Sequence, residues 1–361
     1  MTEDESRDAG AFEFTGTWRE FAPIAFTNLL LTIVTLGIYR FWATTRERRY
    51  LWSRTRFIDE RLEWTGTGLE LFVGFVLVFA LLLAPLLFLQ FGLQAMILRN
   101  QAALAGLLAI VSYVAILYLI GVAVFRALRY RLSRTYWHGI RGGSDDQGWL
   151  YGVVQLGFTF ASIMTLGLLV PLSMTTRWNF RWNAMSFGPH RFEAAARARP
   201  LMKRFLLFYL LPLLGLLLGI VAFAMGAFSR GGPGAAEGAG AIVAAILGIV
   251  VIAIYPSIAV IALLYYAAYY RQAVGALRLG ELSFSFEART WDWVKLILGH
   301  IGLVIVTLGI GMIFIGYRNW RFAIRHLRAY GDVDLTTFTQ SATRAPGQGE
   351  GLLDAFDIGA V

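Results

Sequence analysis

Seven apolar segments, each long enough to cross a bilayer, dominate this sequence. They lie at 21–43, 69–91, 103–130, 149–175, 205–228, 240–270 and 293–317. About 20 apolar residues in a helix cross the roughly 30 Å hydrocarbon core. Charged residues make up 15% of the 361-residue chain and hydrophobic residues 57%, whereas soluble domains are about 25% charged. The sequence therefore predicts an integral membrane protein.

Four of the segments are almost purely apolar and come in two pairs. The first pair occupies 69–130 and the second 205–270. The connection within each pair carries one basic residue, Arg99 in the first and Arg230 in the second. Because basic loops are retained in the cytoplasm, such weakly charged connections are typical of the outer side. Each pair predicts a transmembrane hairpin.

The first, fourth and seventh segments share a tripeptide inside an apolar stretch, and arginines follow each one. The copies are Thr35-Leu36-Gly37, Thr165-Leu166-Gly167 and Thr307-Leu308-Gly309. Three such copies predict an internal repeat, with units at 12–68, 136–195 and 282–338. Glycine permits a tight reversal of the backbone, so these segments could enter the bilayer and return.

The arginine distribution favours that re-entrant topology. If all seven segments span, residues 40–68 and 176–204 lie on opposite sides, although each stretch holds seven basic residues, and both are expected in the cytoplasm. If the three repeat segments return, only two of the 32 lysines and arginines lie outside. We therefore expect an α-helical polytopic protein with four spanning helices in two hairpins, three re-entrant or interfacial helix-turn-helix elements and cytoplasmic termini. Seven spanning helices are the alternative.

Short alternating stretches between the apolar segments predict strands on the cytoplasmic face. Aromatic residues and threonines alternate at 12–18, 62–68 and 282–288, and more weakly at 333–338, a pattern typical of strands. Ordinary extended linkers are the alternative. We expect one membrane domain over 12–338, with flexible tails at 1–11 and 339–361.

Polar residues inside the three repeat segments are candidates for a polar path. They are Asn28, Thr32, Gln155, Thr159, Ser162, Lys295 and His300. If the three segments converge, these side chains would line a path for a small polar or anionic solute. The alternative is hydrogen bonding across packed helices. The two apolar pairs carry no ionisable residue at mid-membrane depth, which argues against a proton-driven carrier.

Arginines and aromatic residues recur together at the ends of the apolar segments. Residues 46–55 and 126–135 share the pattern Arg-x-x-Arg-Tyr-x-x-Ser-Arg-Thr. Such side chains either anchor a helix at the headgroups or form a site for anionic lipid, where each charge is worth about 1 kcal/mol. The candidates for lipid contact are Arg46, Arg49, Tyr50, Arg54, Arg126, Arg129, Tyr130, Arg134, Arg177, Arg181, Arg318 and Arg321.

The sequence offers no catalytic constellation. It has no cysteine, and the four histidines, His138, His190, His300 and His326, lack the spacing of metal ligands. No Walker loop or nucleophile elbow is present. A net charge of +9 without a separate soluble basic domain does not indicate a nucleic-acid partner. We expect no enzyme activity, metal or cofactor; the expected partner is the bilayer, with anionic lipid at its cytoplasmic face.

The first repeat resembles the YjgN family of bacterial inner-membrane proteins, which is defined by a domain of unknown function. The resemblance rests on "LTIVTLGIYRFWATTRERRYLWSRT" followed by "LEWTGTGLELFVGF", and it extends over 12–338. It implies a multi-pass protein of the inner membrane and supplies no reaction. Together these features predict a transporter or channel-like conduit for a small polar or anionic solute. The alternative is a non-catalytic scaffold whose basic face binds anionic lipid.

Overall fold

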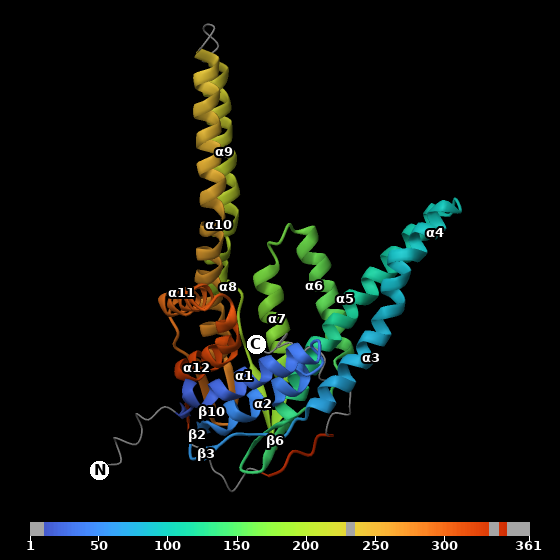
Figure 1. The fold of residues 1–361 in the computed structure, drawn as a ribbon, viewed down its shortest axis with the longest axis vertical. Helices are drawn as coiled ribbons and strands as arrows, with labels where there is room; N and C mark the ends of the chain where they lie inside the picture. The colour runs from blue at the N-terminus through green and yellow to red at the C-terminus, as the bar shows by residue number, and fades with distance from the viewer. Residues whose placement is uncertain (1–10, 229–234, 332–338, 345–361) are drawn as a thin grey trace.

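The computed structural model describes residues 11–228, 235–331 and 339–344. The chain is mostly helical, and its short strands lie together at one end of the molecule (Figure 1). The helices form five antiparallel hairpins, three short and two long. Three stretches of the described helices are long and apolar enough to cross a membrane, Gly68–Leu98, Ala102–Ser133 and Arg199–Val221.

The short hairpins each contain two helices of 12 to 17 residues. They are α1 (Trp18–Val34) with α2 (Arg40–Ser53), α6 (Trp149–Met164) with α7 (Val170–Asn183), and α11 (Thr290–Val306) with α12 (Ile315–His326). The 3-10 segment η2 (Ile310–Phe314) precedes α12. These helices fall below the length that crosses a bilayer upright.

The long hairpins contain the predicted spans. The first consists of α3 (Gly68–Leu87), η1 (Phe88–Gly92), α4 (Leu93–Leu98) and α5 (Ala102–Ser133), and the second of α8 (Arg199–Phe205), α9 (Leu207–Phe228) and α10 (Ala235–Gly275). The predicted span at 240–270 lies within α10. The backbone of α10 runs alongside α9 (Figure 1).

The three Thr-Leu-Gly tripeptides form identical turns between the paired short helices. The leucines have φ of 50° or 51° and the glycines 92° or 93°. The N–H of Gly37 donates to the Thr32 carbonyl five residues earlier (2.7 Å), and Gly167 and Gly309 do the same to Ser162 (2.6 Å) and Val304 (2.8 Å). This bond ends each first helix in a Schellman-type cap.

The threonine of each tripeptide holds the two helices of its hairpin together. The Thr35 hydroxyl donates to the Leu31 carbonyl (2.7 Å) and accepts from the N–H of Tyr39 (2.9 Å). Thr165 and Thr307 make the same pair of bonds to the residues four positions before and four after. One hydroxyl thereby satisfies backbone groups at the end of one helix and the start of the next.

The strands form two antiparallel sheets. The smaller has the order β1-β2-β3, with β1 (Phe12–Phe14), β2 (Thr55–Phe57) and β3 (Glu60–Arg61). The larger has eight strands in the order β11 to β4: β4 (Glu63–Trp64), β5 (Thr135–Trp137), β6 (Ile140–Gly143), β7 (Ser186–Phe187), β8 (His190–Ala194), β9 (Leu277–Leu279), β10 (Leu282–Phe286) and β11 (Leu327–Tyr330). The strands expected at 12–18, 62–68 and 282–288 overlap β1, β4 and β10. The one expected at 333–338 lies outside the described residues.

The sheets arrange the five hairpins in a ring. The helices α5, α7 and α10 each lead into a β-hairpin whose first strand pairs with the last strand of the preceding unit, β5 with β4, β7 with β6 and β9 with β8. The last helix, α12, leads into β11, which pairs with β10. Each helical hairpin contacts the next one around the ring: α2 contacts α3, α5 contacts α6, α7 contacts α8, α10 contacts α11, and α1 contacts η2. Tyr317 closes the ring by donating to the Gly16 carbonyl (3.0 Å). Short and long hairpins thus occupy equivalent places in the ring. Hydropathy alone does not show this, because it differs between the two kinds of hairpin.

Helix ends and strands bury two hydrophobic clusters at the base of the ring. The larger centres on Trp137, Trp178 and Phe192, and the smaller on Phe21, Trp52 and Trp64. Tryptophans also link neighbouring units: the indole N–H of Trp52 donates to the Thr135 hydroxyl and that of Trp320 to the Thr55 hydroxyl, both at 2.9 Å. The base is therefore a filled core that positions the hairpins.

We expect Gly37→Ala to lower stability by about 1 kcal/mol, because only the glycine backbone adopts a φ near 93° without strain. No neighbouring atom lies within 4 Å of a Cβ built at this position, so the loss would come from the backbone alone. Gly106→Ala is the control, since Gly106 lies inside α5 with equally open space and alanine favours a helix. Thermal unfolding in detergent checks this, and an equal loss in both variants would contradict it.

Candidate functional site

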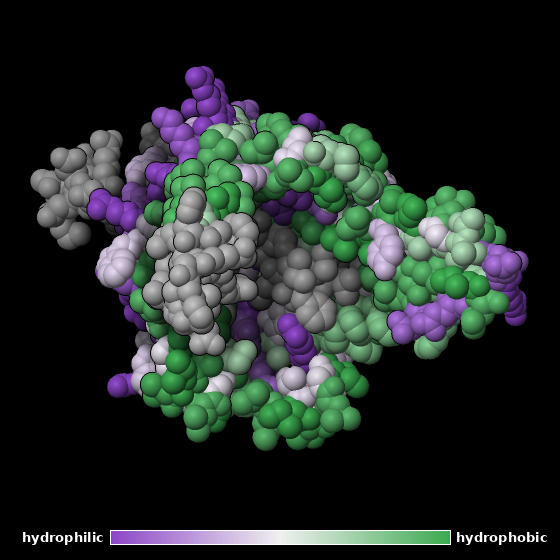
Figure 2. All heavy atoms as spheres, turned by 90° about the horizontal axis from the view of Figure 1, so that it is seen from above, coloured by the Kyte–Doolittle hydropathy of each residue, from purple (hydrophilic) through white to green (hydrophobic). Residues whose placement is uncertain are grey.

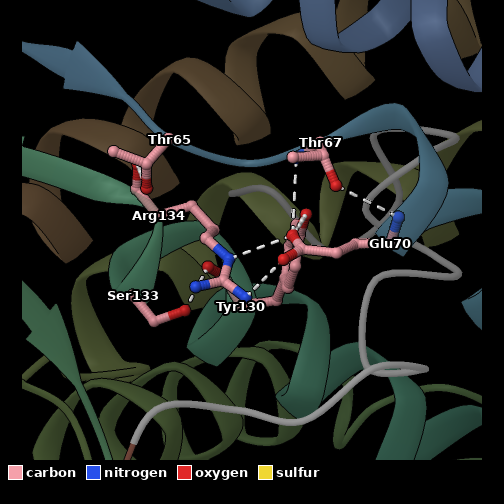
Figure 3. Close-up of polar contacts among 6 residues, drawn as sticks. All are labelled: Thr65, Thr67, Glu70, Tyr130, Ser133 and Arg134. Carbon is pink, nitrogen blue, oxygen red and sulfur yellow. Dashed lines mark hydrogen bonds and ion pairs between the residues drawn. The ribbon is translucent and has the colours of Figure 1, made fainter.

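A carboxylate clasp joins the two ends of the first long hairpin (Figure 3). The Glu70 carboxylate accepts two bonds from the Arg134 guanidinium, from Nε at 3.1 Å and from Nη2 at 2.8 Å, and a third from the Tyr130 hydroxyl at 2.9 Å. Glu70 and Thr67 also form a reciprocal capping box at the start of α3 (3.3 and 3.4 Å), the arrangement that satisfies two free N–H groups of a helix. The Thr65 N–H donates to the Arg134 carbonyl (3.0 Å). The cluster ties the start of α3 to the end of α5.

The first short hairpin carries the same clasp. The Tyr50 hydroxyl donates to the Glu20 carboxylate (3.2 Å) and to the Thr17 carbonyl (2.9 Å). Arg54 forms an ion pair with Glu20 at 3.2 Å, and the Thr15 N–H donates to the Arg54 carbonyl (2.9 Å). Burial, followed by the neighbouring Glu20 carboxylate, raises the pKa of Tyr50 to about 12. The hydroxyl therefore remains a hydrogen-bond donor at physiological pH.

The clasps account for four residues that the sequence suggested as lipid contacts. Tyr50, Arg54, Tyr130 and Arg134 point to protein carboxylates that lie 30 to 64 residues away in the chain. The sequence does contain the signal, because Thr-x-x-Glu follows both Thr-Gly pairs and is the signature of a helix start. We interpreted those stretches as strands, and so the two glutamates were missed.

A pocket of about 240 Å³ opens between α2 and α3, beside the Glu70 clasp. Its lining residues are Tyr39, Trp42, Thr45, Arg46, Arg49, Thr67, Gly68 and Leu69. Arg46 Nη1 donates to the Asn28 amide oxygen (3.2 Å) and to the Tyr39 hydroxyl (3.1 Å), two neutral acceptors. Arg49 is exposed. The pocket combines two guanidinium groups with an aromatic wall.

A second pocket, of about 390 Å³, lies between α6 and α7. It is lined by Phe158, Thr159, Ser162, Ile163, Gly167, Val170, Ser173 and Arg177. Arg177 Nε donates to the Ser173 carbonyl at 3.3 Å. Hydroxyls, one guanidinium and an apolar wall suit a ligand with an anionic head and an apolar body.

The candidate polar-path residues lie in three separate hairpins. Asn28 and Thr32 lie in α1, Gln155, Thr159 and Ser162 in α6, and Lys295 and His300 in α11. Long hairpins flank α6 and α7 on both sides, and α6 packs against α5 and α7 against α8. Thr159 and Ser162 share a pocket, Asn28 is buried, and Lys295 is exposed. Neither described pocket gathers residues from more than one short hairpin.

The remaining candidate arginines differ in their surroundings. Arg126 Nε donates to the Gln147 carbonyl (3.1 Å), and its guanidinium lies 4.6 Å from the Trp149 ring centre. Arg129 and Arg181 are buried in the base. Arg318 lies against Gly299 and His300, and Arg321 beside the Tyr317 hydroxyl. Within the described residues, no group of three or more acidic, cysteine or histidine side chains is arranged to hold a metal ion.

We expect Glu70→Gln to lower the free energy of unfolding by about 1–3 kcal/mol, because it leaves Arg134 without its charge partner in a partly buried site. The side chains of this pair are only 19% and 21% exposed. Glu13→Gln is the matched control, since the Glu13–Arg56 pair is 50% and 46% exposed and such pairs contribute less than about 1 kcal/mol. Equal losses in denaturant unfolding would refute a stabilising clasp.

Sequence comparison relates this chain to known proteins. The family model for "Bacterial protein of unknown function (DUF898)" matches residues 9–355. The inner membrane protein YjgN of Salmonella typhimurium is 26% identical over 213 residues, which cover 50% of this chain and 51% of that protein. The YjgN protein of Escherichia coli O157:H7 is 29% identical over 167 residues, or 46% of this chain and 38% of that protein.

The chain thus spans about half the length, or less, of the named relatives it matches. No solved structure matches it significantly. The family match nevertheless covers nearly the whole chain, and the apolar helices agree with the inner-membrane names of the relatives. The chain belongs to the DUF898 family and is a bacterial inner-membrane protein.

Proposed function

We propose that this protein is a non-catalytic membrane protein that binds anionic lipid in the cytoplasmic leaflet of the inner membrane. The observation that carries the proposal is the pairing of exposed leucines at the three hairpin turns with arginine-lined pockets in two of the short hairpins. An apolar tip enters hydrocarbon, while the guanidinium groups nearer the base meet headgroups. No step in this function requires a catalytic residue.

The topology that goes with this function has four spanning helices and three re-entrant hairpins. The two long hairpins cross the membrane, and the short ones enter from the cytoplasmic side, where both termini also lie. The exposure of the turn leucines supports this: Leu36 is 94% exposed, Leu166 85% and Leu308 92%. Side chains so apolar and so exposed are suited to lipid contact. Seen along the hairpins, the coloured surface of the hairpins is mainly hydrophobic (Figure 2).

One hydrogen bond supports a shallow insertion of the second short hairpin. The Tyr209 hydroxyl donates to the Leu166 carbonyl at 2.6 Å. Tyr209 lies near the start of α9, which continues to Phe228, about 28 Å further at 1.5 Å per residue. The turn therefore lies beside the beginning of a spanning helix. This depth corresponds to the cytoplasmic leaflet.

Exposed tryptophans mark the other end of the short hairpins. Trp18, Trp149 and Trp291 are exposed, and each is the first or second residue of its hairpin. Tryptophan favours the membrane–water interface. The exposed indoles therefore mark the cytoplasmic end of each short hairpin, opposite its leucine turn.

A conduit for a small polar or anionic solute is the second candidate. It is favoured by the pocket between α6 and α7, which contains the Thr159 and Ser162 hydroxyls and has room for a small molecule. The filled base and the separation of the polar residues into three hairpins favour lipid binding instead.

Single-cysteine labelling tests the topology, because the natural chain has no cysteine. We expect Arg191→Cys and Arg61→Cys, both exposed on the strand layer, to react with an impermeant maleimide only in inverted vesicles. Arg99→Cys, in the turn before α5, would react only in intact spheroplasts. Labelling of Arg191→Cys together with Arg99→Cys would support seven spans and rule out re-entrant hairpins.

Lipid preference tests the function. We expect the purified protein in mixed nanodiscs or detergent to retain phosphatidylglycerol several-fold over phosphatidylcholine, measured by native mass spectrometry, and the preference to weaken with salt. Equal retention of the two lipids would overturn the proposal. Solute flux in proteoliposomes that Ser162→Ala reduces, without change in thermal stability, would establish the conduit instead.

A further inference from the structure

We propose that each short hairpin binds one phosphate group through an arginine at a fixed distance after its turn. Arg46 follows Gly37 by nine residues, Arg318 follows Gly309 by nine, and Arg177 follows Gly167 by ten. The ligand is a phosphate ester of a lipid headgroup or free phosphate. The inference rests on the proposed lipid-binding function and adds the residues, the ligand group and the stoichiometry.

The three arginines lie on the base side of their turns, nine or ten residues further along the chain. Nine or ten residues of α-helix correspond to about 13–15 Å, and in the third hairpin the 3-10 segment η2 forms the first five of them. On the proposed topology these guanidinium groups therefore lie on the cytoplasmic side of the turns, toward the headgroups of that leaflet.

The first site is the pocket between α2 and α3. Asn28, nine residues before Gly37, accepts from Arg46 Nη1 at 3.2 Å, and the Tyr39 hydroxyl accepts from the same nitrogen at 3.1 Å. These bonds fix the side chain and leave its other nitrogens for a ligand. Arg49 lines the same pocket. Two acids lie next to the site: the Glu47 carboxylate accepts from the Asn28 amide nitrogen (3.4 Å), and the Glu70 carboxylate accepts from the N–H of the lining residue Thr67 (3.4 Å).

In the third short hairpin, histidine occupies the position of Asn28. His300 lies nine residues before Gly309, and the Arg318 guanidinium lies over the adjacent Gly299. His300 Nε2 and Arg318 Nε are both buried and have no hydrogen-bond partner among the described residues. Buried polar groups normally have partners. A phosphate oxygen would supply one.

The second short hairpin contains the larger of the two pockets described above. Arg177 Nε donates to the Ser173 carbonyl, and the pocket also contains the Thr159 and Ser162 hydroxyls. Guanidinium and hydroxyl groups are typical ligands of phosphate oxygens. Phe158 and Val170 complete the wall, as the apolar part of a lipid requires.

The arginines of the proposed sites differ from those in the clasps in their charge partners. Glu20 and Glu70 neutralise Arg54 and Arg134. Among the residues the structure describes, no carboxylate forms an ion pair with Arg46, Arg177 or Arg318. A cation at the edge of hydrocarbon is costly without an anion. The missing anion at each site is therefore assigned to the phosphate.

Native mass spectrometry with phosphatidylglycerol tests the inference. We expect three tightly bound lipids per chain, one fewer in each of Arg46→Gln, Arg177→Gln and Arg318→Gln, and at least a tenfold weaker affinity in the triple variant. The corresponding lysine variants, which keep the charge, should retain part of the binding. Arg56→Gln is the control, because it removes one charge from an arginine already paired with Glu13. Thermal unfolding of every variant confirms that it is folded.

The possible outcomes distinguish a failure of the proposed arginine sites from a failure of the proposed lipid-binding function. If the wild type prefers phosphatidylglycerol but folded glutamine variants bind like the wild type, the sites are wrong and the function stands. If the wild type shows no preference for anionic lipid, the lipid-binding function fails. In that case, arginine-dependent binding of inorganic phosphate would identify the sites as sites for free phosphate, and its absence would overturn them as well. If Arg56→Gln weakens lipid binding as much as the other glutamine variants do, the effect comes from net charge alone, and the inference is overturned.

Discussion

The contact between one carboxylate, one guanidinium and one phenol at the base of a hairpin underlies much of this structure. Glu70 accepts two bonds from Arg134 and a third from Tyr130, and Glu20 accepts a bond from Tyr50 and forms a single, more exposed ion pair with Arg54. Each clasp joins the first turn of one helix to the last turn of its partner. It satisfies helix N–H groups and an arginine at once, where bulk water is partly excluded. The hairpin therefore leaves the strand layer in a defined direction.

The strand layer extends this local order to the whole molecule. Strands of two to five residues are too short to be stable alone, but each pairs with the preceding unit, and tryptophans connect the units through Thr55 and Thr135. Hairpins of different length can stand in equivalent positions because this base does not depend on their length. A long hairpin spans the membrane, and a short one enters a single leaflet on the proposed topology.

Local sequence signals predicted part of this arrangement. The glycine of Thr-Leu-Gly marks a reversal because few other residues adopt its φ, and hydropathy located Gly68–Leu98, Ala102–Ser133 and Arg199–Val221. The ring was not predictable, because strand pairing leaves no trace in periodicity. The equivalence of the α3–α5 hairpin with the α1–α2 hairpin leaves one local trace, the Arg-x-x-Arg-Tyr-x-x-Ser-Arg-Thr pattern at the ends of α2 and α5, but hydropathy separates the two hairpins. The clasps could not be predicted for a related reason. Helical spacing shows that Tyr130 and Arg134 share a face, but not that Glu70 lies opposite them.

The difference in length between the hairpins has a mechanical consequence. On the proposed topology, ten helices pass through the cytoplasmic leaflet, and four continue into the outer one. The protein is then a wedge with its broad end toward the cytoplasm. A wedge fits best where the cytoplasmic leaflet is convex, since bending there relieves the lateral pressure that extra helices impose. Uneven hairpins would thereby lead the protein to sense, or to produce, membrane curvature.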